Sequence, residues 1–232
     1  MIPWEQLDRA PIPGSADDLQ LWRRGDEFSI RISGYASELM NSRLFTSEQM
    51  LAKLACAVIR ERLAPRVLIG GLGMGFTLGA ALGALGPQAQ VTVAELVPQV
   101  VEWNRGPLGE CAGRPLDDPR CSVQVADVAE LLRVPGARYD AVLLDVDNGP
   151  EGMTQAANGW LYAAAGLTAI RRVLTPGGVL AVWSAEPDPA FEARLTRARF
   201  TTTTHTVRAR PGKGARHTIW LAQPKDTSGK PT

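Results

Sequence analysis

The chain has 232 residues, of which 45% are hydrophobic and 21% are charged. This composition is typical of a globular protein with one sizeable domain. Because 25 Lys and Arg residues nearly balance 24 Asp and Glu residues, the net charge of +1 gives no general electrostatic reason to expect a nucleic-acid or membrane partner.

The first part of the chain has the pattern of a β-hairpin. Residues 19–34 alternate apolar and polar side chains on either side of Arg24-Gly25-Asp26, which predicts two strands joined by a tight turn. A helical pattern follows over residues 47–64, with Ser47 as the expected N-cap. We therefore expect a small N-terminal β region at residues 1–45.

From Arg66 onward, strands and helices alternate. Strands are predicted at residues 66–70, 90–95, 121–127, 139–147 and 178–186, and helices lie between them, including residues 97–106 and 157–174. This order predicts a Rossmann-like α/β fold, doubly wound around a mainly parallel sheet. Two β-rich runs around Pro211-Gly212 predict a C-terminal antiparallel hairpin, which brings the sheet to about seven strands. The main domain should span residues 46–223 and be followed by a disordered tail at residues 224–232.

A cluster of glycines follows the first strand of this unit. Residues 70–75 read Gly-Gly-Leu-Gly-Met-Gly, so Gly71, Gly73 and Gly75 form a GxGxG pattern. Phe76 stands where the dinucleotide fingerprint GxGxxG requires glycine. Such a turn at the carboxyl end of a strand presents backbone N–H groups to a polar or anionic ligand. The alternative is a tight turn whose glycines only allow close packing.

Acidic residues end the next three predicted strands. Glu95 lies 20 residues beyond Gly75, where a carboxylate can accept hydrogen bonds from ribose hydroxyls. Asp127 and Asp145 end the strands that follow. Each acid alone could be a helix cap or a turn residue, but parallel strands end at one edge of the sheet. We therefore expect the three acids in one crevice.

Taken together, these residues resemble the spermidine synthase family, which has the class I S-adenosylmethionine-dependent methyltransferase fold. The resemblance covers residues 66–184 and rests on the GxGxG turn, Glu95, "DDPRCSVQVADVAE", "YDAVLLDVDNGPEG" and "LTPGGVLAVWS". The N-terminal hairpin and "LFTSEQMLA" are also similar to the family's small β domain and the helix after it. The resemblance implies that Glu95 holds the ribose, Asp127 the adenine amino group, and the Gly71–Gly75 turn the amino-acid or aminopropyl end of the cofactor.

The chain also departs from the family pattern. The family's glycine motif usually carries an acid that meets the ligand's ammonium group, and Leu72 or Met74 stands there. The two aspartates three apart in the family's fourth-strand motif become Asp145 and Asn148, with Asp147 between them. Where the family has a tyrosine before the nucleotide unit, this chain has Ser47.

We expect Asp145, together with Asp147 if the chain turns at Asn148, to orient the acceptor and receive its proton. Glu48, Asn148 and Glu151 are the expected acceptor-binding residues. The favoured reaction is methyl transfer from S-adenosylmethionine to a small-molecule acceptor. Aminopropyl transfer from decarboxylated S-adenosylmethionine to a polyamine-type amine is the alternative, and a non-catalytic nucleoside-binding module is a second alternative.

The remaining expectations concern metals, compartment and partners. The three cysteines, Cys56, Cys111 and Cys121, have no CxxC spacing and the chain has only two histidines, so we expect no metal site. Reduced thiols and an N-terminal segment without an apolar run predict a cytoplasmic protein with no membrane partner. The expected partner is a small-molecule acceptor rather than nucleic acid, and a homodimer is left open.

Overall fold

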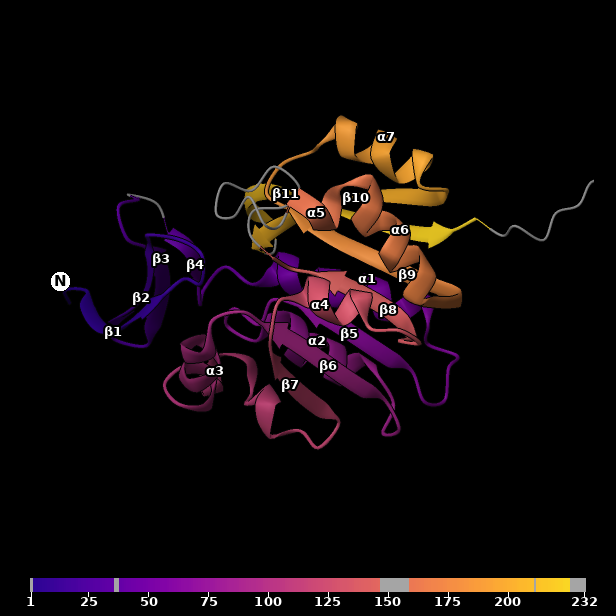
Figure 1. Cartoon of the computed structure of the whole chain (residues 1–232). Helices are drawn as coiled ribbons and strands as arrows, with labels where there is room; N and C mark the ends of the chain where they lie inside the picture. Colours follow the sequence, from indigo (N-terminus) through magenta and orange to yellow (C-terminus); the bar gives the residue numbers. More distant parts are fainter. Residues whose placement is uncertain (1, 36–37, 147–158, 211, 226–232) are drawn as a thin grey trace, which may run out of the picture.

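The computed structural model describes residues 2–35, 38–146, 159–210 and 212–225, which form two β-sheets with helices around the larger one (Figure 1). The smaller sheet is antiparallel and contains β1 (Glu5–Pro11), β2 (Asp18–Arg24), β3 (Glu27–Ile32) and β4 (Glu38–Asn41) in chain order. The hairpin predicted over residues 19–34 is confirmed as β2 and β3. The outer strands β1 and β4 were not predicted.

The larger sheet has seven strands, as predicted from five strands that alternate with helices and a C-terminal hairpin. Its members are β5 (Arg66–Gly70), β6 (Gln90–Glu95), β7 (Cys121–Val125), β8 (Tyr139–Leu144), β9 (Leu174–Ser184), β10 (Phe200–Arg210) and β11 (Lys213–Pro224). Their spatial order is β10-β11-β9-β8-β5-β6-β7. The five strands from β9 to β7 are parallel, and β10 and β11 form the antiparallel hairpin at one edge.

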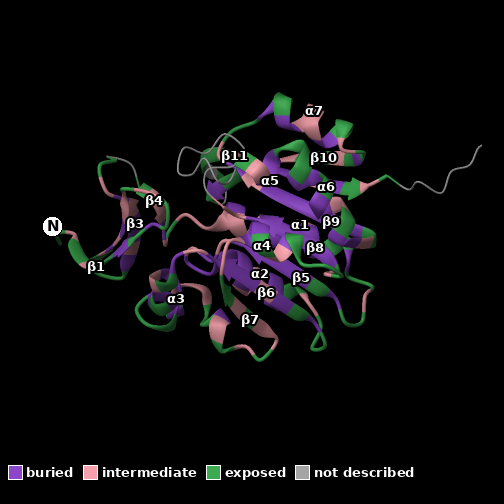
Figure 2. Cartoon of the chain, in the orientation of Figure 1, coloured by how far each residue is buried: buried purple, intermediate pink, exposed green. Residues whose placement is uncertain are grey.

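Helices cover both faces of this sheet because consecutive side chains of its strands point to opposite faces. One face packs against α1 (Thr46–Val58), α2 (Phe76–Ala84) and α3 (Pro98–Arg105), and its core includes Ile69. The other face packs against α4 (Val128–Arg133), α5 (Gly159–Tyr162), α6 (Ala164–Val173) and α7 (Pro189–Arg197), and its core includes Leu68. Two 3₁₀ turns, η1 (Gly109–Ala112) and η2 (Pro115–Asp117), follow α3. Burial is continuous along the central strands (Figure 2).

The helix boundaries differ from the predictions in three places. The expected Ser47 cap is wrong, because α1 already begins at Thr46 and the buried Ser47 hydroxyl donates to Glu48 Oε2 at 2.6 Å. The same helix ends at Val58 rather than continuing to residue 64. In the predicted helix 157–174, Ala163 adopts an extended conformation and separates α5 from α6. Residues 157–158 and most of the predicted tail lie outside the described residues.

Candidate active site

The glycine turn after β5 packs closely against the rest of the chain. Gly71 has a φ of +89°, and a Cβ atom there would lie 2.3 Å from the backbone oxygen of Asp145. A Cβ at Gly73 would lie 3.1 Å from Met40 Sδ. Contacts within the protein therefore require glycine here whether or not a ligand approaches, as the close-packing alternative predicted. Gly71 and Gly73 nevertheless remain on the wall of a cavity.

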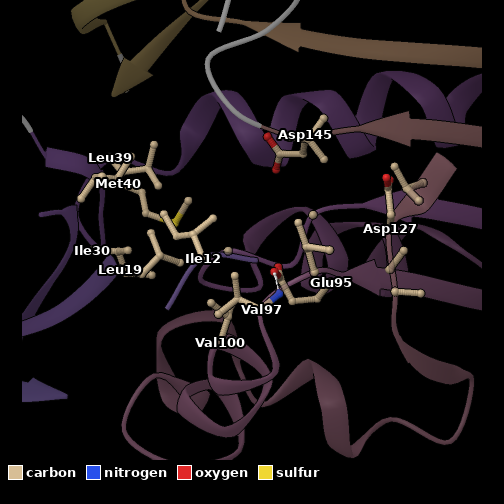
Figure 3. A pocket seen from close by; sticks show the side chains of 18 residues that line it. Ile12, Leu19, Ile30, Leu39, Met40, Glu95, Val97, Val100, Asp127 and Asp145 are labelled. Atoms are coloured by element: carbon tan, nitrogen blue, oxygen red, sulfur yellow. Dashed lines mark hydrogen bonds between the residues drawn. The ribbon is translucent and has the colours of Figure 1, made fainter. Parts of the chain in front are cut away.

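This cavity, which we call cavity A, lies at the carboxyl ends of the parallel strands and has a volume of about 140 Å³. Glu95 ends β6, Asp127 follows β7 and Asp145 follows β8, and all three line cavity A (Figure 3). The expectation that the three acids share one crevice is confirmed by this arrangement. Sheet topology is the reason, because parallel neighbours end at the same edge.

Glu95 is held rigidly at the wall of cavity A. The residue is only 8% exposed; Oε1 accepts the backbone N–H of Val97 at 2.8 Å, and Oε2 accepts that of Leu72 at 3.0 Å. Burial raises the pKa of Glu95, and hydrogen bonds from the backbone N–H groups of Val97, Leu72, Gly73 and Leu96 oppose that shift. Glu95 thus fastens the glycine turn to the start of α3.

Asp127 also has a structural role. It is the N-cap of α4, where its Oδ1 accepts the backbone N–H of Ala129 at 2.8 Å. This is the helix-cap alternative that the sequence left open, and it coexists with a place on the wall of cavity A. The half-buried carboxylate keeps a second oxygen that takes no part in the cap.

The opposite wall of cavity A is apolar and comes from the N-terminal sheet, which the sequence reasoning missed. Figure 3 shows these side chains facing the acids across the cavity. The wall consists of Ile12, Leu19, Ile30, Ile32, Leu39 and Met40. The alternation of apolar and polar side chains along the hairpin predicted a buried face, but it did not indicate which element would cover that face. The sheet is fastened at a second point by Trp103 Nε1, which donates to Asp8 Oδ2 at 2.7 Å.

A second cavity, cavity B, shares Leu39, Met40, Gly73 and Asp145 with cavity A and has a volume of about 70 Å³. It contains a pair of neighbouring acids, Glu48 of α1 and Asp145. Burial, and next the charge of Asp145, raise the pKa of Glu48 to about 7. Burial also raises the pKa of Asp145 to about 6, although the Thr77 hydroxyl, which donates to Asp145 Oδ2 at 2.5 Å, opposes the shift. The two carboxyl groups therefore titrate as a coupled pair near neutral pH.

The structure brings most of the predicted site residues together. Gly71, Gly73, Glu95, Asp127 and Asp145 line cavity A, and Glu48 joins Asp145 in cavity B. Gly75 lies on the lining of neither cavity. The predicted residues Asp147, Asn148 and Glu151 lie outside the described residues. Thr77 and Trp183, which lines cavity B, were missed because neither belongs to a recognised motif.

The described part of the chain lacks two features that would change the chemistry or the location of this site. It has no cluster of three or more His, Cys, Asp or Glu side chains that could hold a metal ion. Among the same residues, none of the helices is both long and apolar enough to cross a membrane.

Comparison with known proteins identifies relatives that are named polyamine aminopropyltransferases. The polyamine aminopropyltransferase 1 of Streptomyces coelicolor is 37% identical over 123 residues, which are 52% of this chain and 22% of that protein. The polyamine aminopropyltransferase of Mycobacterium tuberculosis is 27% identical over 173 residues, 73% of this chain and 31% of that protein. The chain thus spans less than a third of the length of either relative.

Solved structures with the same fold include two kinds of protein. A spermidine synthase in complex with the transition state analogue AdoDATO superposes with a TM-score of 0.71 at 19% identity, covering 94% of this chain and 71% of that one. Human methyltransferase-like protein 13 in complex with SAH superposes with a TM-score of 0.54 at 20% identity, covering 80% of this chain and 82% of that one. At this identity the likeness shows the fold alone.

The expectation of methyl transfer is wrong, since both curated relatives are named aminopropyltransferases. The physical reason for the error is that a glycine turn and strand-end acids indicate a crevice for a nucleoside, and those residues do not distinguish the group that is transferred. The model of the spermine/spermidine synthase domain matches residues 48–197. The chain belongs to the spermine/spermidine synthase family.

Proposed function

We propose that the chain transfers an aminopropyl group from decarboxylated S-adenosylmethionine to an amine, with residues 46–223 as the catalytic unit. The observation that carries the proposal is the charge of the two cavities. Among the described residues that line them, the ionisable side chains are the acids Glu95, Asp127, Asp145 and Glu48, and Arg, Lys and His do not occur. Decarboxylated S-adenosylmethionine carries a sulfonium and an ammonium group, and an amine acceptor is a cation as well. All three match an acidic lining.

Cavity A suits the nucleoside part of such a molecule. Glu95 offers carboxylate lone pairs to the ribose hydroxyls, and Asp127 offers its second oxygen to the adenine amino group. The apolar side chains of the N-terminal sheet and Val97 and Val100 of the α3 region offer surfaces for the adenine ring. This donor and acceptor set fits the cofactor of the family.

Cavity B suits the acceptor, because the acid pair lies where the two cavities meet. When bound, the sulfonium supplies a carbon whose bond to sulfur breaks as the acceptor nitrogen attacks, leaving neutral methylthioadenosine. An ammonium nitrogen has no free lone pair, so a proton must leave it before attack. Asp145 accepts that proton, and a pKa of about 6 makes it a stronger base near neutral pH than an ordinary aspartate. The Thr77 hydroxyl keeps its carboxylate oriented.

Calorimetric titration with decarboxylated and ordinary S-adenosylmethionine tests this function. The ordinary form adds a carboxylate that would meet the acid pair with no cation nearby, so we expect the decarboxylated form to bind at least tenfold more tightly. Glu95→Gln serves as a matched control, because the ribose is common to both ligands and both affinities should fall by the same factor. Equal binding of the two forms by the wild-type chain contradicts the proposal. If none of the amines offered leads to release of methylthioadenosine, the proposal is also contradicted. The chain would then be a nucleoside-binding module without transferase activity.

A further inference from the structure

The polar side chain of Asn104, in the last turn of α3, is buried beside the glycine turn. The residue is 2% exposed and lines neither cavity. Its Nδ2 donates to the backbone oxygen of Gly73 at 2.8 Å and to that of Val100 at 2.8 Å. The bond to Gly73 joins residues 31 positions apart in the chain, so it ties the helix directly to the turn.

Two backbone N–H groups fasten the start of the glycine turn to the end of β6. The N–H of Gly71 donates to a backbone oxygen of β6 at 2.9 Å, and that of Leu72 donates to Glu95 Oε2 at 3.0 Å. Gly73 follows with a φ of +52°, and glycine adopts either sign of φ about equally well, so its peptide is free to rotate unless a further bond holds it. The Asn104 amide supplies that bond.

Gly73 lies where the two cavities meet. Among the described residues, it lines both cavities together with Leu39, Met40 and Asp145. The fit is close, because a Cβ atom at Gly73 would lie 3.1 Å from Met40 Sδ. A ligand that reaches from the nucleoside end of cavity A to the acid pair in cavity B passes this junction. The orientation of the Gly73 peptide therefore sets the room that the transferred group has.

The neighbouring residue of α3 holds the other side of the junction. Trp103 Nε1 donates to Asp8 Oδ2 in the N-terminal sheet, which is the sheet that supplies Met40. One turn of α3 thus bonds both the glycine turn and the sheet that packs against it. The spacing between these two elements at the junction depends on this turn of the helix.

Stability alone does not account for an asparagine at position 104. Its Oδ1 is buried and has no hydrogen-bond partner among the described residues, and a Cβ atom at Gly75 would lie 3.0 Å from it. A buried amide oxygen without a partner opposes folding. Leucine has a similar size and would fill the same space without an unpaired oxygen. What leucine lacks is the N–H donor for Gly73.

We propose that Asn104 is a positioning residue for aminopropyl transfer, whose amide fixes the Gly73 peptide so that the junction of the two cavities admits the transferred group. This inference rests on the proposed function and adds to it a residue that lines neither cavity and acts through Gly73. A ligand that stays within cavity A should bind independently of Asn104. A ligand whose tail passes the junction should depend on it.

Two ligands that share a nucleoside test the inference by binding alone. Methylthioadenosine ends at its methylthio group, whereas decarboxylated S-adenosylmethionine carries the aminopropyl chain into the junction. In Asn104→Leu, we expect the affinity for the decarboxylated cofactor relative to that for methylthioadenosine to fall about fivefold by calorimetry, the factor that one lost hydrogen bond gives. Asn104→Ser is too short to reach Gly73 and should show the same fall without added bulk, so it also decides the matter if the leucine variant does not fold.

Val101→Ala is the matched control. Val101 is 2% exposed in the same helix and lines neither cavity, so its truncation loosens α3 without removing the bond to Gly73. We expect a lower melting temperature and the wild-type affinity ratio. With saturating decarboxylated cofactor and 1,4-diaminobutane, the single-turnover rate should fall about tenfold or more in Asn104→Leu and stay at the wild-type value in Val101→Ala, at a temperature where both are folded.

Failure of the inference differs from failure of the proposed function. A wild-type affinity ratio in either folded Asn104 variant overturns the inference and leaves the proposed function intact. An equal fall of the ratio in Val101→Ala also overturns it, because the effect would then belong to α3 as a whole. If the ratio falls as expected but the wild-type chain releases no methylthioadenosine with any amine, the transfer reaction is wrong and Asn104 remains a determinant of binding at the junction.

Discussion

Glu48 pairs with Asp145 in a place where ionisation of both carboxyl groups is unfavourable. Because its folded-state pKa of about 7 lies above its ordinary value, the unfolded chain loses the Glu48 proton at lower pH than the folded chain does. The stability contributed by protonated Glu48 is therefore complete below pH 4.5 and is lost as the pH rises through about 7. The other groups near this carboxyl are Ser47, which donates a hydrogen bond to it, and Thr77, which bonds its partner acid.

Glu48→Gln should remove this pH dependence. The amide cannot ionise, and its oxygen can still accept the hydrogen bond from Ser47. The variant should therefore melt about 2–4 °C above the wild type at pH 8. A gain of about 1 kcal/mol in the free energy of unfolding produces a shift of this size in a chain of this length. At pH 5 the difference should be much smaller. Melting curves at both pH values measure it. A difference that does not change with pH would mean that Glu48 does not titrate abnormally.

Asp145→Asn separates proton transfer from binding. The amide can keep the hydrogen bond with Thr77 but is a far weaker base, so single-turnover release of methylthioadenosine at saturating cofactor should fall about 10²–10⁴-fold. In the wild type the rate should decline as the pH falls through about 6, because protonated Asp145 no longer accepts a proton. Because Glu48 titrates nearby, the apparent pKa of this acidic limb of the pH–rate profile describes the Glu48–Asp145 pair and not Asp145 alone.

The acidic limb of the pH–rate profile provides a control for the role of Asp145. Thr77→Val removes a hydrogen bond that favours the charged carboxylate, so it should move the limb to higher pH while Asp145 remains in place. Full activity of Asp145→Asn would remove this residue from the mechanism.

At the scale of elements, Asp127 both caps α4 and lines cavity A, and one substitution can divide these roles. Asparagine is as good an N-cap as aspartate, but its amide presents a donor where the adenine amino group needs an acceptor. Asp127→Asn should therefore keep the wild-type melting temperature and bind methylthioadenosine more weakly. Asp127→Ala should lose the affinity and also about 1 kcal/mol of stability. If Asp127→Asn binds methylthioadenosine as tightly as the wild type does, Asp127 acts only as a helix cap.

The sequence predicted the elements of the sheet because buried parallel strands leave apolar runs that glycines and acids punctuate. Glu95 and Asp127 could be located for the same reason, since strand ends converge on one edge of the sheet. The Ser47 cap could not be judged locally, because the choice between capping and bonding Glu48 depends on how α1 packs. Trp183 could not be assigned to the site, because only the packed sheet brings β9 beside α1 and the glycine turn.

For the whole molecule, the informative contact joins the two sheets. The buried Trp103 donates to the exposed Asp8, which holds the N-terminal sheet against α3 beside cavity A. The sequence predicted the N-terminal hairpin but not this docking, because no local pattern pairs residues so far apart in the chain. The apolar wall of cavity A was missed for the same reason.

Asp8→Ala should loosen the apolar wall by leaving the Trp103 indole N–H without its acceptor. We expect about fivefold weaker binding of methylthioadenosine, corresponding to about 1 kcal/mol for one hydrogen bond. Asp8→Asn, which retains an oxygen acceptor, is the matched control and should bind as the wild type does. If Asp8→Ala also binds as the wild type does, the wall is held by apolar packing alone.

The parallel pairing of β5 with β8 has a consequence for how the site comes into existence. Gly70 lies opposite Leu144, and both the glycine turn and Asp127 belong to the long intervening stretch of chain. Closing that stretch costs chain entropy, and cavity A exists only where the central strands are associated. A nucleoside bound there consequently stabilises the molecule against global unfolding, by about 2.7 kcal/mol at a hundredfold excess over Kd. Thermal stabilisation by a ligand would then report on the entire parallel sheet, and a fragment ending before β8 would possess the glycine turn without the cavity.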